Sequence, residues 1–423
     1  MFTVTEQRPV RRVRHNGRGS QILIYLGKQL RFFINESDWK VLPMAGIIAA
    51  LVTMVIRKRF FQNMEGDLLS AFALACVAIW NGSFNSIQAV CRERQIVKRE
   101  HRAGLHISAY MLAHMIYQLF LCAMQTGITL FVMVMLGDYE SPGVTPMKQV
   151  LLGKGFMTPL MALDIGITML LITYAADMMS LLISSFTHTT TGAMTVMPFV
   201  LIFQLIFAGS LIPLPAWSKP LSSFTISNYG IRALTSQAGY NESVLITPLN
   251  TLDELQDRRI SGEVSLGQMI DYLQDPVVQR YRDRVILPST TYGQALKTML
   301  QAMELDEEIY EDAVASGFFN PDGTFRPVTL GDVIDYVSGS AVLRQRRDLK
   351  ISYNTSVGEL MELIGKDRVR EIVRDTTTAA SHKPEYERTV PNIVKNWAML
   401  GLFIVVFAGL ATLILEMIDH DKR

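Results

Sequence analysis

The chain has 423 residues, 49% of them hydrophobic, and a mean hydropathy of +0.23. These values lie above those of a typical globular domain and below those of a pure membrane bundle, so the composition fits an integral membrane protein with a soluble part. The formal net charge of +1 hides an asymmetry, because residues 239–390 hold 17 basic and 25 acidic residues whereas the remainder holds 23 basic and 14 acidic. All three cysteines, Cys76, Cys91 and Cys122, lie outside 239–390, which excludes a disulfide framework or a cysteine-based zinc site in that stretch.

The N-terminal region reads as a basic tail followed by an amphipathic helix. Residues 1–19 are rich in arginine and lack the apolar segment of a cleavable signal peptide, so we expect a cytoplasmic tail. Residues 20–36 place apolar side chains at helical spacing, at Ile22, Leu26, Leu30 and Phe33. This pattern predicts a helix lying in the membrane interface, and a soluble helix packed on a partner is the alternative.

Six apolar segments follow, and each could cross a bilayer core of about 30 Å, alone or with flanking residues. They are residues 41–56, 68–91, 108–136, 158–186, 191–211 and 393–418. Six crossings place both termini on one side, and the basic tail and the basic loop after the second segment predict that this side is the cytoplasm. The basic residues 57–59, after the first segment, fall on the opposite side and go against the rule.

The loop between the second and third segments is densely charged. It runs Glu93-Arg94-Gln95-Ile96-Val97-Lys98-Arg99-Glu100, with Gly104 and Tyr110 beyond it. A basic cytoplasmic loop alone would explain part of this pattern. After the fifth segment come Gly209, Pro213, Trp217 and the run Tyr229-Gly230-Ile231-Arg232-Ala233-Leu234. The prolines break the helix there, and the tryptophan suits the headgroup layer.

These two motifs, in this order among the apolar segments, resemble the membrane domain of ABC-2, or G-type, ABC transporters. The resemblance covers roughly residues 20–234 and 393–423. It implies that the charged loop is a coupling helix that presses on an ATPase subunit, with Arg92, Glu93, Arg94, Arg99, Glu100 and Gly104 as its residues. It further implies that two permease chains meet across the second and fifth segments, and that ATP on a separate subunit drives export.

Polar residues within the apolar segments allow two interpretations. Asn81, Asn85 and Gln88 share one helical face of the second segment, and His114, Gln118 and Gln125 share one face of the third. The functional interpretation is a translocation path lined by Asn81, Asn85, Gln88, Gln118 and Gln125. The alternative is interhelical hydrogen bonding that holds the bundle together. Asp177, in the fourth segment, is expected to be structural and paired with a basic residue.

Residues 239–390 contain an internal repeat. Its copies begin at Ser265, Thr329, Ser356 and Thr291, and each has an acid or amide three residues later, at Gln268, Asp332, Glu359 and Gln294. This is the spacing of a capping box at the start of a helix, so we predict a helical insert built from four or more short helices. Repeated binding of a peptide or polymer is the alternative role.

The sequence lacks catalytic motifs. The Gly-Lys pairs at Gly27, Gly153 and Gly365 are not followed by Ser or Thr, so none belongs to a phosphate-binding loop, and no zinc-protease or serine-hydrolase motif occurs. We therefore expect no enzyme activity, no metal site and no cofactor on this chain.

The predicted fold is mostly α: a six-span transmembrane helical bundle (37–238 and 391–423, with a re-entrant exit after the fifth span), an N-terminal interfacial helix, and a helical extracytoplasmic insert (239–390). The expected function is the permease subunit of an exporter in the cell membrane. Its expected partners are a separate ABC ATPase subunit, a second permease chain and membrane lipids, with no nucleic acid. The alternative function is a membrane-anchored sensor or assembly factor whose insert binds an extracellular ligand.

Overall fold

The computed structural model describes residues 17–35, 38–139, 144–210, 214–290 and 326–417, which form two compact units. Unit 1 runs to Ile246 and resumes at Thr378, and unit 2 is Thr247–Thr377. Unit 2 is therefore shorter at both ends than the expected insert, 239–390. The difference arises because Tyr240 and Tyr386, just outside unit 2, pack edge to face at 5.1 Å beside Met64 of unit 1.

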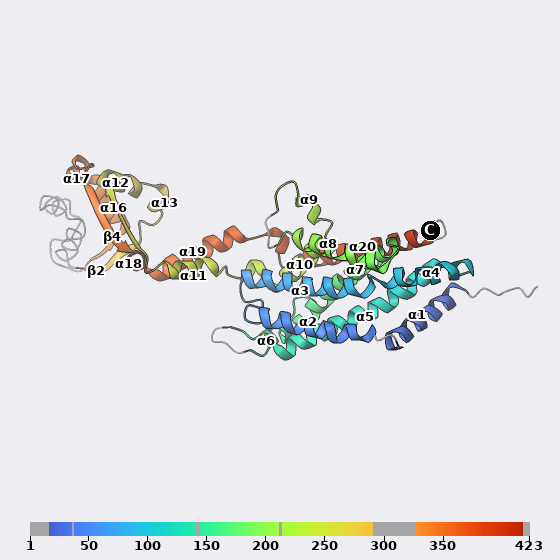
Figure 1. The fold of residues 1–423 in the computed structure, drawn as a ribbon. Coiled ribbons are helices and arrows are strands. Elements are labelled where there is room, and N and C mark those ends of the chain that lie inside the picture. Colours follow the sequence, from blue (N-terminus) through green and yellow to red (C-terminus); the bar gives the residue numbers. More distant parts are fainter. Residues whose placement is uncertain (1–16, 36–37, 140–143, 211–213, 291–325, 418–423) are drawn as a thin grey trace, which may run out of the picture. The chain divides into compact units, whose positions relative to one another are not determined.

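Unit 1 is a bundle of helices (Figure 1). In chain order these are α1 (Arg18–Asn35), η1 (Asp38–Lys40), α2 (Val41–Ile56), α3 (Met64–Ser86), α4 (Ala89–Arg102), α5 (Ile107–Leu136), α6 (Met147–Leu152), α7 (Met161–Phe186), α8 (Thr190–Ile206), α9 (Lys219–Ser222), α10 (Ile226–Ala238), η2 (Tyr240–Glu242), η3 (Pro384–Tyr386) and α20 (Val390–Glu416).

The apolar helices identify a multi-pass membrane protein. Within the described residues, four helical stretches are long and apolar enough to cross a membrane: α3 continued by α4, α5, α7 and α20. Two shorter apolar helices, α2 and α8, occupy the first and fifth expected segments. All six expected segments are thus helical, whereas the count of six crossings stays a prediction.

The core of unit 1 lies around α7, which packs against α3, α10 and α20. Leu74, Ile165, Ile172 and Leu400 are among its fully buried side chains. At Gly82, α3 crosses α7 so closely that a Cβ atom would collide with the carbonyl oxygen of Thr173 on α7. Small residues at such crossings let membrane helices approach each other, and this one fixes α3 against α7.

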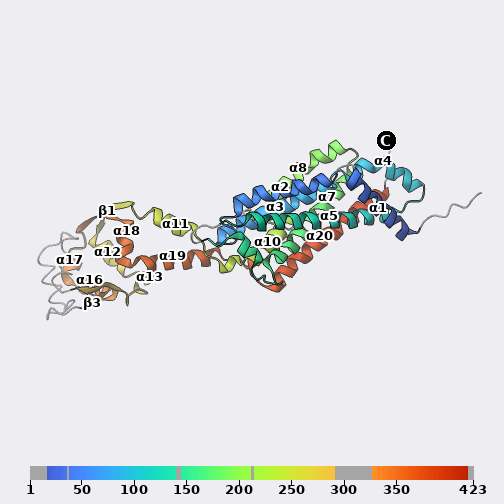
Figure 2. The ribbon, with the colours of Figure 1, turned by 90° about the horizontal axis from the view of Figure 1, so that it is seen from below.

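Unit 1 has two distinct ends. At one end, α1, α4, the start of α5 and the last turns of α20 share a cluster that includes Tyr25, Val97, Tyr110 and Leu415, and Figures 1 and 2 show these elements together. The opposite end contains η2 and η3. The loop residues 57–59 follow α2 there, and the Arg57 guanidinium lies 4.5 Å from the ring centroid of Tyr139.

A polar clasp joins the two chain segments that leave unit 1 toward unit 2. The Asn241 side chain donates to the Lys383 carbonyl at 2.9 Å and accepts from the Lys383 amide at 3.1 Å. Ion pairs flank it, Arg388 with Glu242 at 3.0 Å and Arg232 with Glu385 at 2.6 Å.

Unit 2 mixes strands and helices, so the expectation of a helical insert is wrong in part. Within its described residues the elements are α11 (Thr247–Glu254), β1 (Arg259–Ser265), α12 (Leu266–Leu273), α13 (Pro276–Gln279), β2 (Val285–Thr290), β3 (Arg326–Thr329), α16 (Leu330–Gly339), α17 (Ala341–Gln345), β4 (Lys350–Ser356), α18 (Val357–Ile364) and α19 (Lys366–Ser381, ending just beyond the unit). β1 pairs antiparallel with β4, and β2 pairs antiparallel with β3. Leu266, Ile270, Val337 and Leu343 form its buried core.

The repeat is a strand followed directly by a capped helix. The capping boxes predicted at Ser265, Thr329 and Ser356 are confirmed, and each cap residue is also the last residue of a strand. The fourth copy, at Thr291–Leu296, lies outside the described residues.

A second anchor at each helix start explains the glycine in the repeat. The amides of Leu266 and Gly267 donate to the carbonyls of Leu349 and Arg347, both at 2.9 Å. The corresponding amides of α16 donate to Arg284 and Arg282, and those of α18 to Arg258 and Gln256. A Cβ at Gly267 would come within 3.0 Å of the Arg347 side chain, so the close approach favours glycine. These contacts satisfy the orphan amides of the helix starts internally.

Candidate functional site

The charged loop folds as helix α4, which has a buried face and an exposed face. Glu93, Arg94 and Val97 are buried, whereas Gln95, Ile96 and Arg99 are exposed. The helix ends at Arg102 with Ala103 as its C-cap, and Gly104 then takes a positive φ of 105°, a conformation that suits glycine. Of the six residues expected to contact an ATPase, Arg92 and Arg99 are exposed; Glu93, Arg94, Glu100 and Gly104 face the protein wholly or in part.

The two glutamates of the motif bind α1 and α5. Tyr25 donates its hydroxyl to a Glu100 oxygen, and the buried hydroxyl of Tyr110 donates to Glu93 at 3.4 Å. Lys28 forms an ion pair with Glu93 at 3.4 Å. Burial, together with the hydrogen bond to Glu100, raises the pKa of Tyr25 above its ordinary value, so this phenol stays a donor. The spacing of Glu93, Glu100 and Tyr110 therefore reflects contacts within the chain.

The face of α1 toward the bundle is polar, which the apolar spacing did not predict. Its buried residues are Gln21, Tyr25 and Gln29. Gln21 donates to the Gly104 carbonyl at 3.1 Å and accepts from the His106 amide at 3.0 Å. The opposite, exposed face of α1 carries large apolar side chains at Leu23, Ile24, Leu30 and Ile34. These exposed side chains suit a helix at the membrane interface, and the buried stripe ties that helix to the C-terminal end of α4 and to His114 of α5.

The other side of α4 is fixed to the end of α7. Arg94 donates to the Ser185 carbonyl at 2.8 Å, and the amides of Val90 and Cys91 donate to the Ser184 hydroxyl at 3.0 and 3.1 Å. A displacement of α4 would consequently pull on α1 and on α7 together, because hydrogen bonds reach both.

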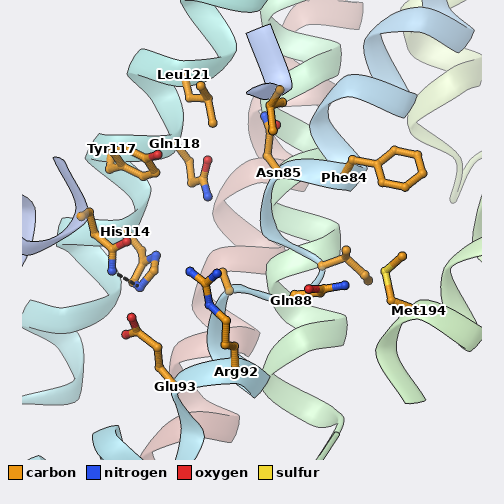
Figure 3. Close-up of a pocket in the computed structure, with 14 residues that line it drawn as sticks. Phe84, Asn85, Gln88, Arg92, Glu93, His114, Tyr117, Gln118, Leu121 and Met194 are labelled. Atoms are coloured by element: carbon orange, nitrogen blue, oxygen red, sulfur yellow. Dashed lines mark hydrogen bonds between the residues drawn. The ribbon is translucent and has the colours of Figure 1, made fainter. Parts of the chain in front are cut away.

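A polar cavity of about 210 Å³ lies beside the start of α4 (Figure 3). Its lining includes Asn85, Gln88, Arg92, Glu93, His114 and Gln118. His114 and Gln29 are joined by a 3.0 Å hydrogen bond in its wall. The Gln118 side chain is 3% exposed, and its Oε1 has no hydrogen-bond partner. A buried amide oxygen without a partner can accept a hydrogen bond from a solute that enters.

The structure separates the five residues of the predicted path. Asn85, Gln88 and Gln118 line the cavity, whereas Asn81 and Gln125 are buried elsewhere. Gln88 stands in the turn between α3 and α4, so the expected continuous helical face ends at Ser86. A path through these three residues stays a prediction.

Gln125 is engaged by Asn85 in a reciprocal pair across α3 and α5. Asn85 donates to Gln125 Oε1 at 2.8 Å, and Gln125 donates to Asn85 Oδ1 at 2.9 Å. For this pair the structure favours the interhelical hydrogen bond over the path.

Asp177 is not paired with a basic residue, contrary to expectation. It is fully buried on α7, and neither carboxyl oxygen has a hydrogen-bond partner. The prediction is wrong because this face of α7 meets α3 near Gly82. Asp164, at the start of the same helix, instead accepts from the amides of Phe156 and Met157 at 2.6 and 2.9 Å.

The exit from the fifth segment also folds compactly. Gly209 has a positive φ of 70°, Trp217 is exposed, and α10 then packs against α3, α7 and α20. The α10 residues Tyr229 and Leu234 are buried in the main core. Pro213 lies outside the described residues.

Within the described residues, no group of three His, Cys, Asp or Glu side chains is placed to hold a metal ion. Residues 28–237 match the family model described as ABC-2 type transporter. A comparison with curated proteins finds no match.

Proposed function

Since this chain carries the ABC-2 type transporter membrane domain over residues 28–237, we propose that it is the permease subunit of an exporter driven by a separate ABC ATPase subunit. The observation that carries the proposal is α4, a charged helix with an exposed face beside the membrane bundle. In this proposal the ATPase binds that face, and ATP is bound and hydrolysed on the partner.

The contacts of α4 support a division of roles within the coupling helix. Gln95, Ile96 and Arg99 would contact the ATPase, because their side chains are exposed. Glu93 and Glu100 would transmit its movement, because they bind Lys28 and Tyr25 of α1. The polar cavity beside Glu93 would receive cargo from the cytoplasmic side.

Two exposed faces support a second permease chain as partner. On α3, Trp80 and Phe84 stack at 6.2 Å between ring centroids, and each is 45% exposed. On α8, Phe199 is 72% and Ile202 is 52% exposed. Large apolar surfaces of this kind mark contacts with lipid or with another protein. We propose that these faces of α3 and α8 meet their counterparts in a dimer.

Site-directed photocrosslinking in cells tests the ATPase interface. A photoreactive amino acid at Ile96, which is exposed, should crosslink to a polypeptide with a phosphate-binding loop, identified by mass spectrometry. The same group at Val97, which is fully buried, should not. Arg99→Glu should reduce co-purification of that ATPase, and Arg31→Glu, an equal charge change on α1, should leave it intact.

The interface proposal fails if Ile96 crosslinks only to lipid and Arg99→Glu co-purifies like the wild type. That result would favour the alternative, a membrane-anchored sensor. The proposed side of unit 2 has its own test. Ser261→Cys, on exposed β1, in a variant without the natural cysteines, should react with an impermeant maleimide in intact cells. Labelling only after lysis would place unit 2 in the cytoplasm.

A further inference from the structure

The described residues of unit 2 line an apolar slot that is open to solvent. The slot, of about 460 Å³, lies between α13 and α19, which Figure 2 shows in the same part of the unit. It is lined by Val277 and Val278 of α13, by Val369, Ile372 and Val373 of α19, and by Tyr272 at the end of α12. Its volume is within the range of about 300–1,000 Å³ typical of small-molecule sites.

The helices that form the slot are held weakly by the protein core. Neither α13 nor α19 has a buried residue. Tyr272 is 69% and Val277 is 59% exposed, although both are large apolar side chains. Val369, Ile372 and Val373 repeat at the three- and four-residue spacing that forms one face of a helix. A contiguous apolar lining left open to water is typical of a surface that binds an apolar group.

A second cavity, of about 360 Å³, adjoins this slot and is basic. It shares Tyr281 and Arg284 with the slot, and its other lining residues are Arg280, Asp283 and Arg368. Arg368 is engaged by Glu371 at 2.6 Å. Neither Arg280 nor Arg284 has an ion-pair partner among the residues that the structure describes, whereas Arg282 of the same turn is paired with Asp335.

The Arg284 side chain is seated at the junction between α18 and α19. Its Nη2 would lie 2.7 Å from a Cβ atom at Gly365, and Gly365 has a positive φ of 94°. A larger residue there would displace the guanidinium, so glycine leaves the space that it occupies. Guanidinium groups bind carboxylates through two parallel hydrogen bonds.

From this geometry we propose that unit 2 binds a single-chain anionic amphiphile of the long-chain carboxylate class. Its alkyl chain lies in the slot between α13 and α19, and its carboxylate binds Arg280 and Arg284 in the adjoining cavity. The two arginines favour an anion over a neutral apolar ligand, because a guanidinium forms charge-assisted hydrogen bonds with a carboxylate and none with an alkyl chain. The site does not depend on the proposed transport function, since binding is measured directly.

Photolabelling of the full chain in lipid nanodiscs tests the proposal. The probe is a sixteen-carbon carboxylate with a diazirine on the alkyl chain, and labelled positions are mapped by mass spectrometry. We expect adducts within residues 272–284 and 366–373. Dodecanoate should compete for this labelling, and its methyl ester, which lacks the anion, should compete at least tenfold less well.

Variants localise the two halves of the site. Arg280→Ala combined with Arg284→Ala should weaken competition by dodecanoate at least tenfold and leave the methyl ester unaffected. Ile372→Trp should fill the slot and so weaken competition by dodecanoate and by its methyl ester alike. Arg374→Glu, on the same helix but outside both linings, is the matched control and should label like the wild type.

The competition arms use the wild-type protein, so they decide the question even if a variant fails to fold. Equal competition by dodecanoate and its methyl ester would overturn the anionic ligand. Adducts confined to the apolar helices of unit 1 would overturn the site, because the probe would then report only lipid around the bundle.

Discussion

The reciprocal pair between Asn85 and Gln125 predicts a measurable energetic coupling between α3 and α5. Asn85→Leu and Gln125→Met keep the approximate size of each side chain and remove its polar groups. Asn85→Leu leaves the buried Gln125 amide without this partner, which typically costs about 1–3 kcal/mol, whereas Gln125→Met should cost less because Asn85 is half-buried and lines the polar cavity. The double change removes both partners, so its cost should be well below the sum of the two.

The expected coupling follows from the geometry of the pair. Two hydrogen bonds join the residues, at 2.8 and 2.9 Å, and Gln125 is completely buried. Side-chain hydrogen bonds between membrane helices contribute about 0.6 kcal/mol on average and about 1.7 kcal/mol at most. Two of them give a coupling free energy of roughly 1.2 kcal/mol, with roughly 3.4 kcal/mol as the upper bound.

The assay is reversible unfolding of the purified full chain in mixed micelles, for the wild type, both single variants and the double variant. Gln118→Met is the control, because Gln118 lines the cavity and its Oε1 bonds to nothing. It should not couple to Asn85→Leu. Additive free energies for the pair would refute a structural role. A Gln125→Met variant that is stable yet has lost transport would also refute the structural role, because it would show that Gln125 belongs to the translocation path.

Three further predictions concern stability and are measured by unfolding of the full chain. Gly82→Ala should destabilise strongly, because its Cβ would strike the α7 backbone, whereas Gly127→Ala has no atom within 4 Å and should be nearly neutral. Asp164→Asn should cost about 1 kcal/mol through the loss of charge-assisted bonds from two amides, whereas Asp177→Asn should cost less, because neither Asp177 oxygen has a donor in good hydrogen-bond geometry. Equal losses would contradict both assignments. Ser265→Ala should cost about 0.5–2 kcal/mol as a lost helix cap, and a silent change would remove capping as the reason for the repeat.

The helices and their caps could be predicted because their signals are local. Continuous apolar runs located the six apolar helical segments of unit 1, and a hydroxyl three residues before an acid or amide located the starts of α12, α16 and α18. Strands β1, β3 and β4 were missed because each is short and is followed at once by its helix. In β1 only Ile260 and Val264 alternate with polar residues, with Gly262 between them. The stronger helical signal beside them dominated the prediction.

The partners of the polar residues could not be predicted, because they lie far away in sequence. Glu100 binds Tyr25, and Asn85 binds Gln125, across separations that no spacing rule covers. The same limit applies to Asp177, whose neighbours depend on how α3 crosses α7. The charged loop is a helix, as its predicted role as a coupling helix requires, but its spacing gave no sign that Glu93 and Glu100 contact α1 and α5.

The antiparallel pairing of β1 with β4 holds the two ends of unit 2 together within the unit itself. Bringing together the ends of a flexible loop as long as Thr247–Thr377 would cost roughly 4 kcal/mol in chain entropy, plus a constant. Because β1 and β4 pair near the two ends of unit 2, that cost is met inside the unit. The clasp between Asn241 and Lys383 then has only short segments to hold. The stability of the helical bundle should therefore depend little on the length of the inserted chain, so unit 2 could differ in size and chemistry without a change in the bundle.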